Sequence, residues 1–205
     1  MKPNILITGR YKLLNKKQIF YLDKGWKSYF KHINCRYMLY EKKNASKSFD
    51  EFDCLIISGG GDIYDISKNK YDKQRDKIEL KLFNKFIKIK KPIILICRGF
   101  QLIASNNKNK IVKLQNHVCK NHRVNIKKNK LVKYNFLKTN SFHNYGIKRL
   151  NKHFLTLGKS KDKYIEMAIF RKNTLCLMFH PERINTDNNK IDRIILKQIN
   201  NILCN

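Results

Sequence analysis

The chain has 205 residues, of which 42% are hydrophobic, and its formal net charge is +30 at pH 7. This length predicts one domain covering residues 1–205, with enough apolar content for a full core. No apolar run reaches the roughly 18 residues of a membrane span, and the apolar N-terminal run is too short for a signal peptide, so we expect a cytoplasmic protein without membrane contact. Lysines are spread along the whole chain without a nucleic-acid-binding motif, so we expect no nucleic-acid partner, although the positive field would attract an anionic, phosphate-bearing small substrate.

Short apolar runs alternate with segments of helical periodicity in the first half of the chain. The predicted strands are Pro3–Thr8, Tyr37–Tyr40, Cys54–Ile57 and Pro92–Ile96, and the predicted helices are Lys17–Phe30 and Asp76–Ile89. Fully apolar strands separated by helices indicate an α/β fold, a mostly parallel sheet covered by helices on both faces.

The second half is richer in strand patterns. The candidates are Lys110–Leu114, Arg123–Ile126, Tyr134–Leu137, Glu166–Phe170 and Leu175–Phe179, followed by a closing helix over Asp187–Leu203. In parallel α/β sheets, ligands bind beyond the carboxyl ends of the strands. We therefore expect Arg10, the Gly59–Asp62 turn and Cys97 to gather at one edge of the sheet.

Six cysteines lie at positions 35, 54, 97, 119, 176 and 204. Their spacing matches neither a zinc site nor a disulfide scaffold. In a reducing compartment most of them should be buried free thiols, and one could be catalytic.

Cys97 has the most informative surroundings. The segment Leu95–Gln101 is typical of a nucleophile elbow, a strand that turns sharply into a helix. Cys97 would then lie at a helix N-terminus, where the helix dipole favours a thiolate. The main-chain N–H of Arg98 would stabilise an oxyanion at the same spot, with Gly60 or Gly61 supplying a second donor.

A thiol nucleophile needs a base, and the base needs an acceptor that orients it. The segment Phe179–Arg183 offers both directly after an apolar strand, with His180 as the candidate base and Glu182 as its orienting partner. A cysteine or histidine at a strand end, taken alone, is more often structural. Two such motifs of complementary chemistry favour a cysteine hydrolase with the catalytic residues Cys97, His180 and Glu182.

Five motifs in order resemble the class I glutamine amidotransferase-like superfamily, in its free-standing γ-glutamyl hydrolase branch. They are the Ser58–Asp62 turn, the R-D-x-x-E helix start in Gln74–Glu79, the Pro92–Gln101 elbow, the N-S-x-H segment Asn140–Asn144 and the F-H-P-E motif Phe179–Glu182. The resemblance implies a flavodoxin-like fold and a hydrolase that cuts a γ-glutamyl amide bond through a thioester intermediate and releases L-glutamate, without a metal or cofactor. One position departs from the family, because Leu95 stands where the elbow has its first glycine, which should affect activity more than the fold.

The resemblance also implies a substrate site. Asn140, Ser141, Phe142 and His143 would line a glutamyl pocket beside Gln101, although His143 could instead be a structural loop residue. Arg10, at the same edge of the sheet, is a further candidate for binding the substrate. A narrower resemblance, carried by Cys119–His122 with Asn140–Asn144 and His180–Arg183, implies a nucleotide-linked substrate. Lys120, Asn121 or His122 would then face the nucleotide, and a polar loop without a ligand is the equally weighted alternative.

Three other functions remain open at the level of sequence. The chain could be a glutaminase subunit that feeds ammonia to a synthetase, since that activity would use the same catalytic residues. It could be an inactive binding protein on this fold, as Leu95 and the basic charge suggest. It could also hydrolyse a different γ-glutamyl substrate, such as a γ-glutamyl-polyamine derivative or a folate polyglutamate. The number of subunits cannot be predicted.

Overall fold

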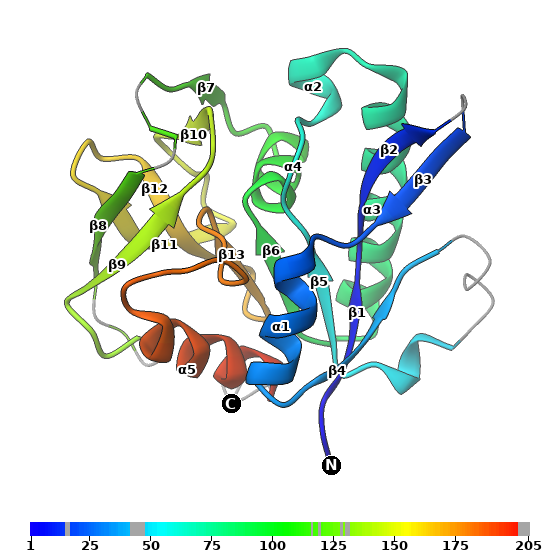
Figure 1. Cartoon of the computed structure of the whole chain (residues 1–205). Coiled ribbons are helices and arrows are strands. Elements are labelled where there is room, and N and C mark those ends of the chain that lie inside the picture. The colour runs from blue at the N-terminus through cyan, green and yellow to red at the C-terminus, as the bar shows by residue number, and fades with distance from the viewer. Residues whose placement is uncertain are drawn as a thin grey trace.

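The computed structural model describes residues 1–14, 17–41, 48–115, 117–118, 120–127, 129 and 132–200. Within these residues a nine-stranded sheet has the order β4-β1-β5-β6-β13-β12-β11-β8-β9 (Figure 1). The parallel strands are β4 (Arg36–Leu39), β1 (Asn4–Ile7), β5 (Cys54–Ile57), β6 (Ile93–Ile96) and β13 (Thr174–Leu177). The antiparallel strands that extend the sheet are β12 (Ile165–Phe170), β11 (Phe154–Ser160), β8 (Lys120–Ile126) and β9 (Phe136–Ser141).

The parallel part has a flavodoxin-like strand order. When the five parallel strands are numbered by their order along the chain, their order across the sheet, β4-β1-β5-β6-β13, reads 2-1-3-4-5. The predicted α/β fold is therefore confirmed. The antiparallel part comes from the second half of the chain, where consecutive strands pair without crossover helices.

Helices cover both faces of the sheet (Figure 1). On one face, α1 (Lys24–His32) and α5 (Asn188–Ile199) share a core with Ile5 and Ile7 of β1. On the other face, α3 (Lys70–Lys88) and α4 (Arg98–Asn106) share a second core with Leu6. Successive strand residues point to opposite faces, so a strand such as β1 must be apolar throughout.

One predicted helix is wrong in its first half. Lys17–Phe30 contains β3 (Lys17–Tyr21), which pairs with β2 (Arg10–Leu14), and the helix begins only at Lys24. The side chain of Asp23 accepts a hydrogen bond from the main-chain nitrogen of Gly25 at 3.3 Å and caps that helix. A short apolar pattern fits either element, and here the antiparallel pairing decided it.

Other boundaries differ less from the predictions. The helix predicted over Asp76–Ile89 begins earlier, because Asn69 caps α3, and the closing helix ends as α5 at Ile199, with residues 201–203 outside the described residues. The strand β11 was not predicted. The small sheet of β7 (Ile111–Lys113) and β10 (Tyr145–Ile147) was not predicted either, although a strand was predicted at Lys110–Leu114. A short helix, α2 (Tyr64–Ser67), precedes α3.

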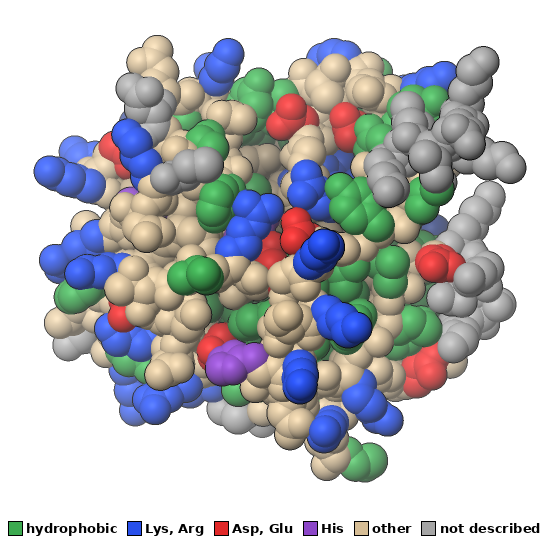
Figure 2. Space-filling model, viewed as in Figure 1, with side chains coloured by type: hydrophobic (Ala, Val, Ile, Leu, Met, Phe, Trp, Pro, Cys, Tyr) green, Lys and Arg blue, Asp and Glu red, His purple; other side chains and the backbone are tan. Residues whose placement is uncertain are grey.

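The surface carries the charge in a dispersed form. Figure 2 shows Lys and Arg side chains scattered over the visible face rather than gathered in one patch. Among the described residues, no helix combines the length and the apolar character that crossing a bilayer requires.

Candidate active site

Cys97 occupies a sharp turn between β6 and α4. It is the N-cap residue of α4 with φ 47° and ψ −102°, and its side chain is nearly buried. Positive φ is uncommon for a residue with a side chain and often marks a functional site. The turn is fixed on both sides, because the main-chain nitrogen of Cys97 donates to Leu177 O at 2.7 Å and that of Gln101 donates to Cys97 O at 3.0 Å.

Two neighbours of Cys97, Gly99 and Leu95, affect the packing around this turn. A β-carbon on Gly99 would lie 2.6 Å from the carbonyl oxygen of Ile57, so only glycine lets α4 approach β5 this closely. Leu95 is fully buried within β6, in the core shared with α3 and α4, and the turn at Cys97 forms with this bulky residue in place.

His180 and Glu182 follow the adjacent strand β13. Nδ1 of His180 lies 2.7 Å from Oε1 of Glu182, and both side chains are buried. Burial alone would lower the pKa of His180, but the negative charges of Glu182 and of the Cys97 sulfur outweigh it and raise the pKa to about 10. The imidazolium form is therefore favoured between these two groups.

Cys97 and His180 meet at Gly59. A β-carbon on Gly59 would lie 2.5 Å from Cε1 of His180 and 3.2 Å from Cβ of Cys97. The three residues follow β5, β6 and β13, which are neighbours in the sheet. The structure thus brings together the three predicted catalytic side chains at the carboxyl ends of parallel strands, where ligands bind in such folds.

The side chain of Arg75 anchors the glycine turn that follows β5. Its guanidinium donates to the carbonyl oxygens of Gly60 at 2.7 Å and Ser58 at 3.1 Å. Gly60 and Gly61 both have positive φ, 88° and 77°. Because C=O and N–H point in opposite directions across a trans peptide, the bond from Gly60 O turns the N–H of Gly61 away from Arg75.

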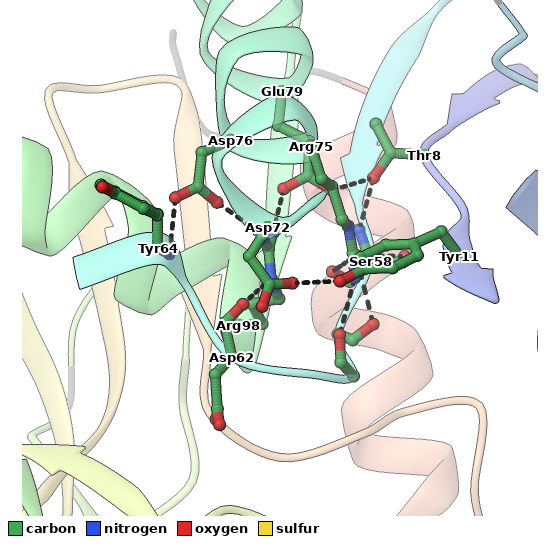
Figure 3. A network of polar contacts seen from close by, with 12 residues as sticks. Thr8, Tyr11, Ser58, Asp62, Tyr64, Asp72, Arg75, Asp76, Glu79 and Arg98 are labelled. Atoms are coloured by element: carbon green, nitrogen blue, oxygen red, sulfur yellow. Dashed lines mark hydrogen bonds and ion pairs between the residues drawn. The ribbon is translucent and has the colours of Figure 1, made fainter. Parts of the chain in front are cut away.

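Arg98 is anchored in the same network (Figure 3). Its guanidinium is fully buried, bonds to the carboxylates of Glu79 and Asp76, and donates to Asp62 O at 2.9 Å. Glu79 also accepts from Arg75 Nε and from the Thr8 hydroxyl, each at 2.9 Å. The R-D-x-x-E residues of α3 therefore tie the glycine turn to the residue that follows Cys97. The main-chain N–H of Arg98 is the first of α4 and has no partner within the helix.

A cavity of about 370 Å³ lies in front of these residues. We call it the Cys97 cavity, and its lining consists of Arg10, Gly60, Gly61, Asp62, Cys97, Gln101, Phe142, His143, Asn144, Tyr145, His180 and Arg183. A larger space of about 570 Å³ beside Met1 and Lys90 lies near the amino ends of the parallel strands. Its described lining residues include no cysteine or histidine, so the Cys97 cavity is the better candidate for chemistry.

The predicted substrate-binding residues fall into three groups. Arg10, Gln101, Phe142 and His143 line the Cys97 cavity. Asn140 and Ser141 are buried and are not among its lining residues. Asn140 Nδ2 donates to His180 O at 2.8 Å, its Oδ1 accepts from His180 N at 2.9 Å, and Ser141 donates to His117 O. Asn140 therefore positions His180.

Lys120, Asn121 and His122 line a different space. We call it the outer pocket; it measures about 430 Å³, and its lining consists of His117, Lys120, Asn121, His122, Ser160, Lys161 and Asp162. Cys119, in the same predicted segment, lies outside the described residues.

Four lining residues of the Cys97 cavity, Asp62, Asn144, Tyr145 and Arg183, had no binding role in the sequence prediction, although Asp62 belongs to the turn that was expected at this edge of the sheet. Arg183 shares Asp23 with Arg10, at 3.6 Å and 3.4 Å, and its guanidinium lies 4.4 Å from the ring centroid of Phe142. Its place directly after the Phe179–Glu182 motif was the available signal. The two guanidinium groups share one carboxylate, so on this wall a positive charge is left to attract an anionic ligand, with the carboxylate of Asp62 elsewhere in the lining.

The fold is shared with solved structures of known proteins. A glutamine amidotransferase from Thermotoga maritima aligns with a TM-score of 0.68 and 14% identity, over 98% of this chain and 84% of that one. A PurLQS chain from the same organism aligns with a TM-score of 0.71 and 18% identity, over 99% and 100%. At such low identities the likeness shows the fold alone, which is that of the class I glutamine amidotransferases.

Sequence comparison narrows this class. Residues 37–182 match the model of the Peptidase C26 family, and the chain belongs to that family. Over 136 residues it is also 35% identical to a γ-glutamyl-CDP-amidate hydrolase from Campylobacter jejuni. This match covers 66% of the chain and 64% of that relative's own length.

Proposed function

We propose that the protein is a cysteine hydrolase that cleaves a γ-glutamyl amide bond and releases L-glutamate. The observation that carries the proposal is the placement of Cys97 beside the His180–Glu182 pair at one wall of the Cys97 cavity. Membership of the Peptidase C26 family and the name of the Campylobacter relative support the same chemistry.

The reaction would proceed in two halves. The thiolate of Cys97 attacks the γ-carbonyl carbon, and the carbonyl electron pair moves onto oxygen, where the N–H groups of Arg98 and of the Gly60–Gly61 turn stabilise it. His180 gives its proton to the leaving nitrogen as the C–N bond breaks, which leaves a glutamyl thioester. His180 then takes a proton from water, the hydroxide displaces the thiolate, and glutamate leaves. Glu182 holds the imidazole orientation throughout.

The proposed substrate is γ-glutamyl-CDP-amidate, with cytidine diphosphoramidate as the second product, which would place the protein in capsular phosphoramidate biosynthesis. The 35% identity to a γ-glutamyl-CDP-amidate hydrolase supports this choice. Arg10 and Arg183 offer positive charge at the Cys97 cavity, and Lys120 and Lys161 offer it at the outer pocket, in keeping with an anionic leaving group.

A substrate panel tests both levels of the proposal. Glutamate release is measured from γ-glutamyl-CDP-amidate, a γ-glutamyl-polyamine, a folate polyglutamate and glutamine, with Cys97→Ala as the blank. We expect kcat/KM to be highest for the CDP-amidate. Preference for another amide would overturn the substrate and keep the hydrolase, whereas no release from any amide would overturn the hydrolase.

A further inference from the structure

Three histidines surround one buried glutamate beside the active site. Glu166 of β12 is fully buried, and His117, His122 and His143 approach it from three other segments. Nε2 of His117 lies 3.5 Å from Oε1 of Glu166, while Nε2 of His122 and of His143 lie 3.5 Å and 3.6 Å from Oε2. These four side chains do nothing in the mechanism proposed above.

Five polar atoms at the centre of this cluster lack a hydrogen-bond partner within the described part of the chain. Neither carboxylate oxygen of Glu166 and none of the three Nε2 atoms has a hydrogen-bond partner among the described residues, although all are buried. Leaving a buried polar atom unsatisfied costs about 1–3 kcal/mol, and five such atoms at one point call for a missing partner.

The tautomers indicate what kind of partner is missing. Nδ1 of His143 lies 3.0 Å from the carbonyl oxygen of Tyr145, which can only accept, so Nδ1 carries the hydrogen. Nδ1 of His117 faces a carboxylate oxygen of Asp162 at 3.4 Å in the same way. In the neutral rings, Nε2 therefore presents a lone pair to the Glu166 oxygens. Lone pairs facing one another in a buried site require a cation between them.

The distances match a metal ion. Ligand atoms bound tetrahedrally at about 2.1 Å lie about 3.4 Å from one another. The distance from His117 to Oε1 of Glu166 and the distances from His122 and His143 to Oε2 are close to this value. One ligand atom each of His117, His122 and Glu166 also falls within 4.8 Å of the others. We propose that Glu166, His117 and His122 form a binding site for one divalent transition-metal ion, best matched by Zn²⁺, and that His143, 3.6 Å from Oε2 of Glu166, joins them as the fourth ligand when the ion binds.

The surroundings have the features of a metal site. The bonds that hold Nδ1 of His143 and His117 are those that orient metal-binding imidazoles in proteins. His117 and His122 line the outer pocket, which gives the ion an entry path, whereas His143 also lines the Cys97 cavity. The ion would join β8, β12 and the segment after β9, and would hold His143 in the cavity wall as a positioning residue. This proposal does not depend on the hydrolase function.

A proton is the competing occupant. The three imidazoles hold the pKa of Glu166 well below its usual range although burial opposes this, and the carboxylate of Glu166 raises the pKa of His117 although burial lowers it. Ion pairing with a protonated histidine would thus also satisfy the carboxylate. Of these two occupants, only the metal ion would be detected as one equivalent of metal per chain.

The test measures metal content in the full chain carrying Cys97→Ala and no histidine tag, so that the catalytic thiol contributes no binding. After chelation and reconstitution with Zn²⁺ alone, mass spectrometry of the metal should find one equivalent per chain, and Zn²⁺ should raise Tm. In the same background, His122→Ala should weaken Zn²⁺ binding at least about 100-fold, and the exposed control His153→Ala should leave it unchanged.

His122 is the most exposed of the four ligand side chains, at 17%, so its loss is the least disruptive to folding, which circular dichroism checks. Tetrahedral Co²⁺ absorption that appears in the parent and disappears in His122→Ala would support the site independently. Absence of stoichiometric uptake by the parent, or equal uptake by His122→Ala and His153→Ala, would overturn the proposal and leave the proton as occupant.

Discussion

Arg98, the residue that follows the candidate nucleophile, bonds inside the protein to the carboxylate of Glu79 on a different helix. The same carboxylate accepts from Arg75, whose guanidinium holds the glycine turn. One buried carboxylate therefore bridges two arginines that position opposite sides of the proposed oxyanion site, and Asp76 supplies Arg98 with a second carboxylate. This relationship gives the R-D-x-x-E residues a physical role.

Replacing Glu79 should be costly. Glu79→Gln leaves two buried guanidinium groups short of a counter-charge, and breaking such a pair costs about 3–5 kcal/mol. We expect urea unfolding to show a loss of that order, whereas the exposed control Glu51→Gln should change the free energy of unfolding by less than about 0.5 kcal/mol. Equal effects of the two substitutions would contradict the network's role.

The sequence predicted the parts of the fold that depend on local pattern. Cys54–Ile57 and Ile93–Ile96 are apolar at every position because both sheet faces are covered, and such runs can be recognised without a structure. The helix predicted over Lys17–Phe30 was wrong in its first half because the structure there does not follow from local pattern. The strand in its first half is determined by pairing with β2, which the spacing of its apolar residues does not encode.

The candidate site also has residues that local pattern predicted and residues that it did not. Cys97, His180 and Glu182 each follow a predicted strand, so the rule for the carboxyl ends of parallel strands was enough to place them together. The histidine cluster escaped prediction because no cysteine pair accompanies the closely spaced His117 and His122, and because His143 and Glu166 reach them only through the pairing of separate segments. Asn140 was assigned to the substrate pocket, but its hydrogen bonds to His180 depend on tertiary contacts.

Cys97 should be the reactive thiol. Burial raises the pKa of the Cys35 thiol to about 11, and burial also raises the pKa values of Cys54 and Cys176, so these thiols stay protonated and unreactive near neutral pH. We expect a thiol-directed glutamine analogue, followed by peptide mass spectrometry, to label Cys97 first. Labelling of Cys97→Ala at the parent's rate, or full hydrolysis by that variant, would rule out Cys97 as nucleophile, and Cys35→Ser serves as the control.

Glu182 should set the ionisation of His180. Glu182→Gln removes a charge that raises the pKa, while burial, which lowers it, remains, so the pKa of His180 should fall from about 10. An NMR pH titration of the imidazole measures this directly, and kcat should fall about 10²–10⁴-fold because the base loses its orientation and driving force. An unchanged titration in Glu182→Gln would show that the carboxylate is not the cause.

The same pKa makes stability depend on pH. The folded-state pKa of about 10 exceeds the roughly 6.5 of an unfolded histidine, so the folded state binds the extra proton. This contribution is fully present below about pH 6.5 and is lost as pH rises toward 10. Urea unfolding between pH 7 and 8.5 should therefore show a steeper loss of stability in the parent than in Glu182→Gln. Parallel curves would contradict the assignment.

Leu95 should stabilise the core and should not lower kcat. Leu95→Gly restores the family's glycine but removes a fully buried side chain, which costs about 2–5 kcal/mol, with up to about 1 kcal/mol more for glycine in a strand. We expect a marked drop in Tm without a gain in kcat. The control is Leu155→Gly at an exposed position of β11. A faster and equally stable Leu95→Gly variant would show that Leu95 does slow the elbow.

Arg183 should bind the anionic substrate rather than act in the chemical step. It lines the Cys97 cavity, pairs with Asp23 and lies over Phe142, and it has no part in the proposed Cys97–His180–Glu182 chemistry. Charge-assisted hydrogen bonds are worth about 1.5–3 kcal/mol, so Arg183→Gln should raise KM roughly 10–100-fold with little change in kcat. Arg149→Gln removes the same charge from an exposed position and controls for the field of the whole molecule. A similar rise in KM in both variants would assign the effect to that field, and a fall in kcat alone would place Arg183 in the chemistry.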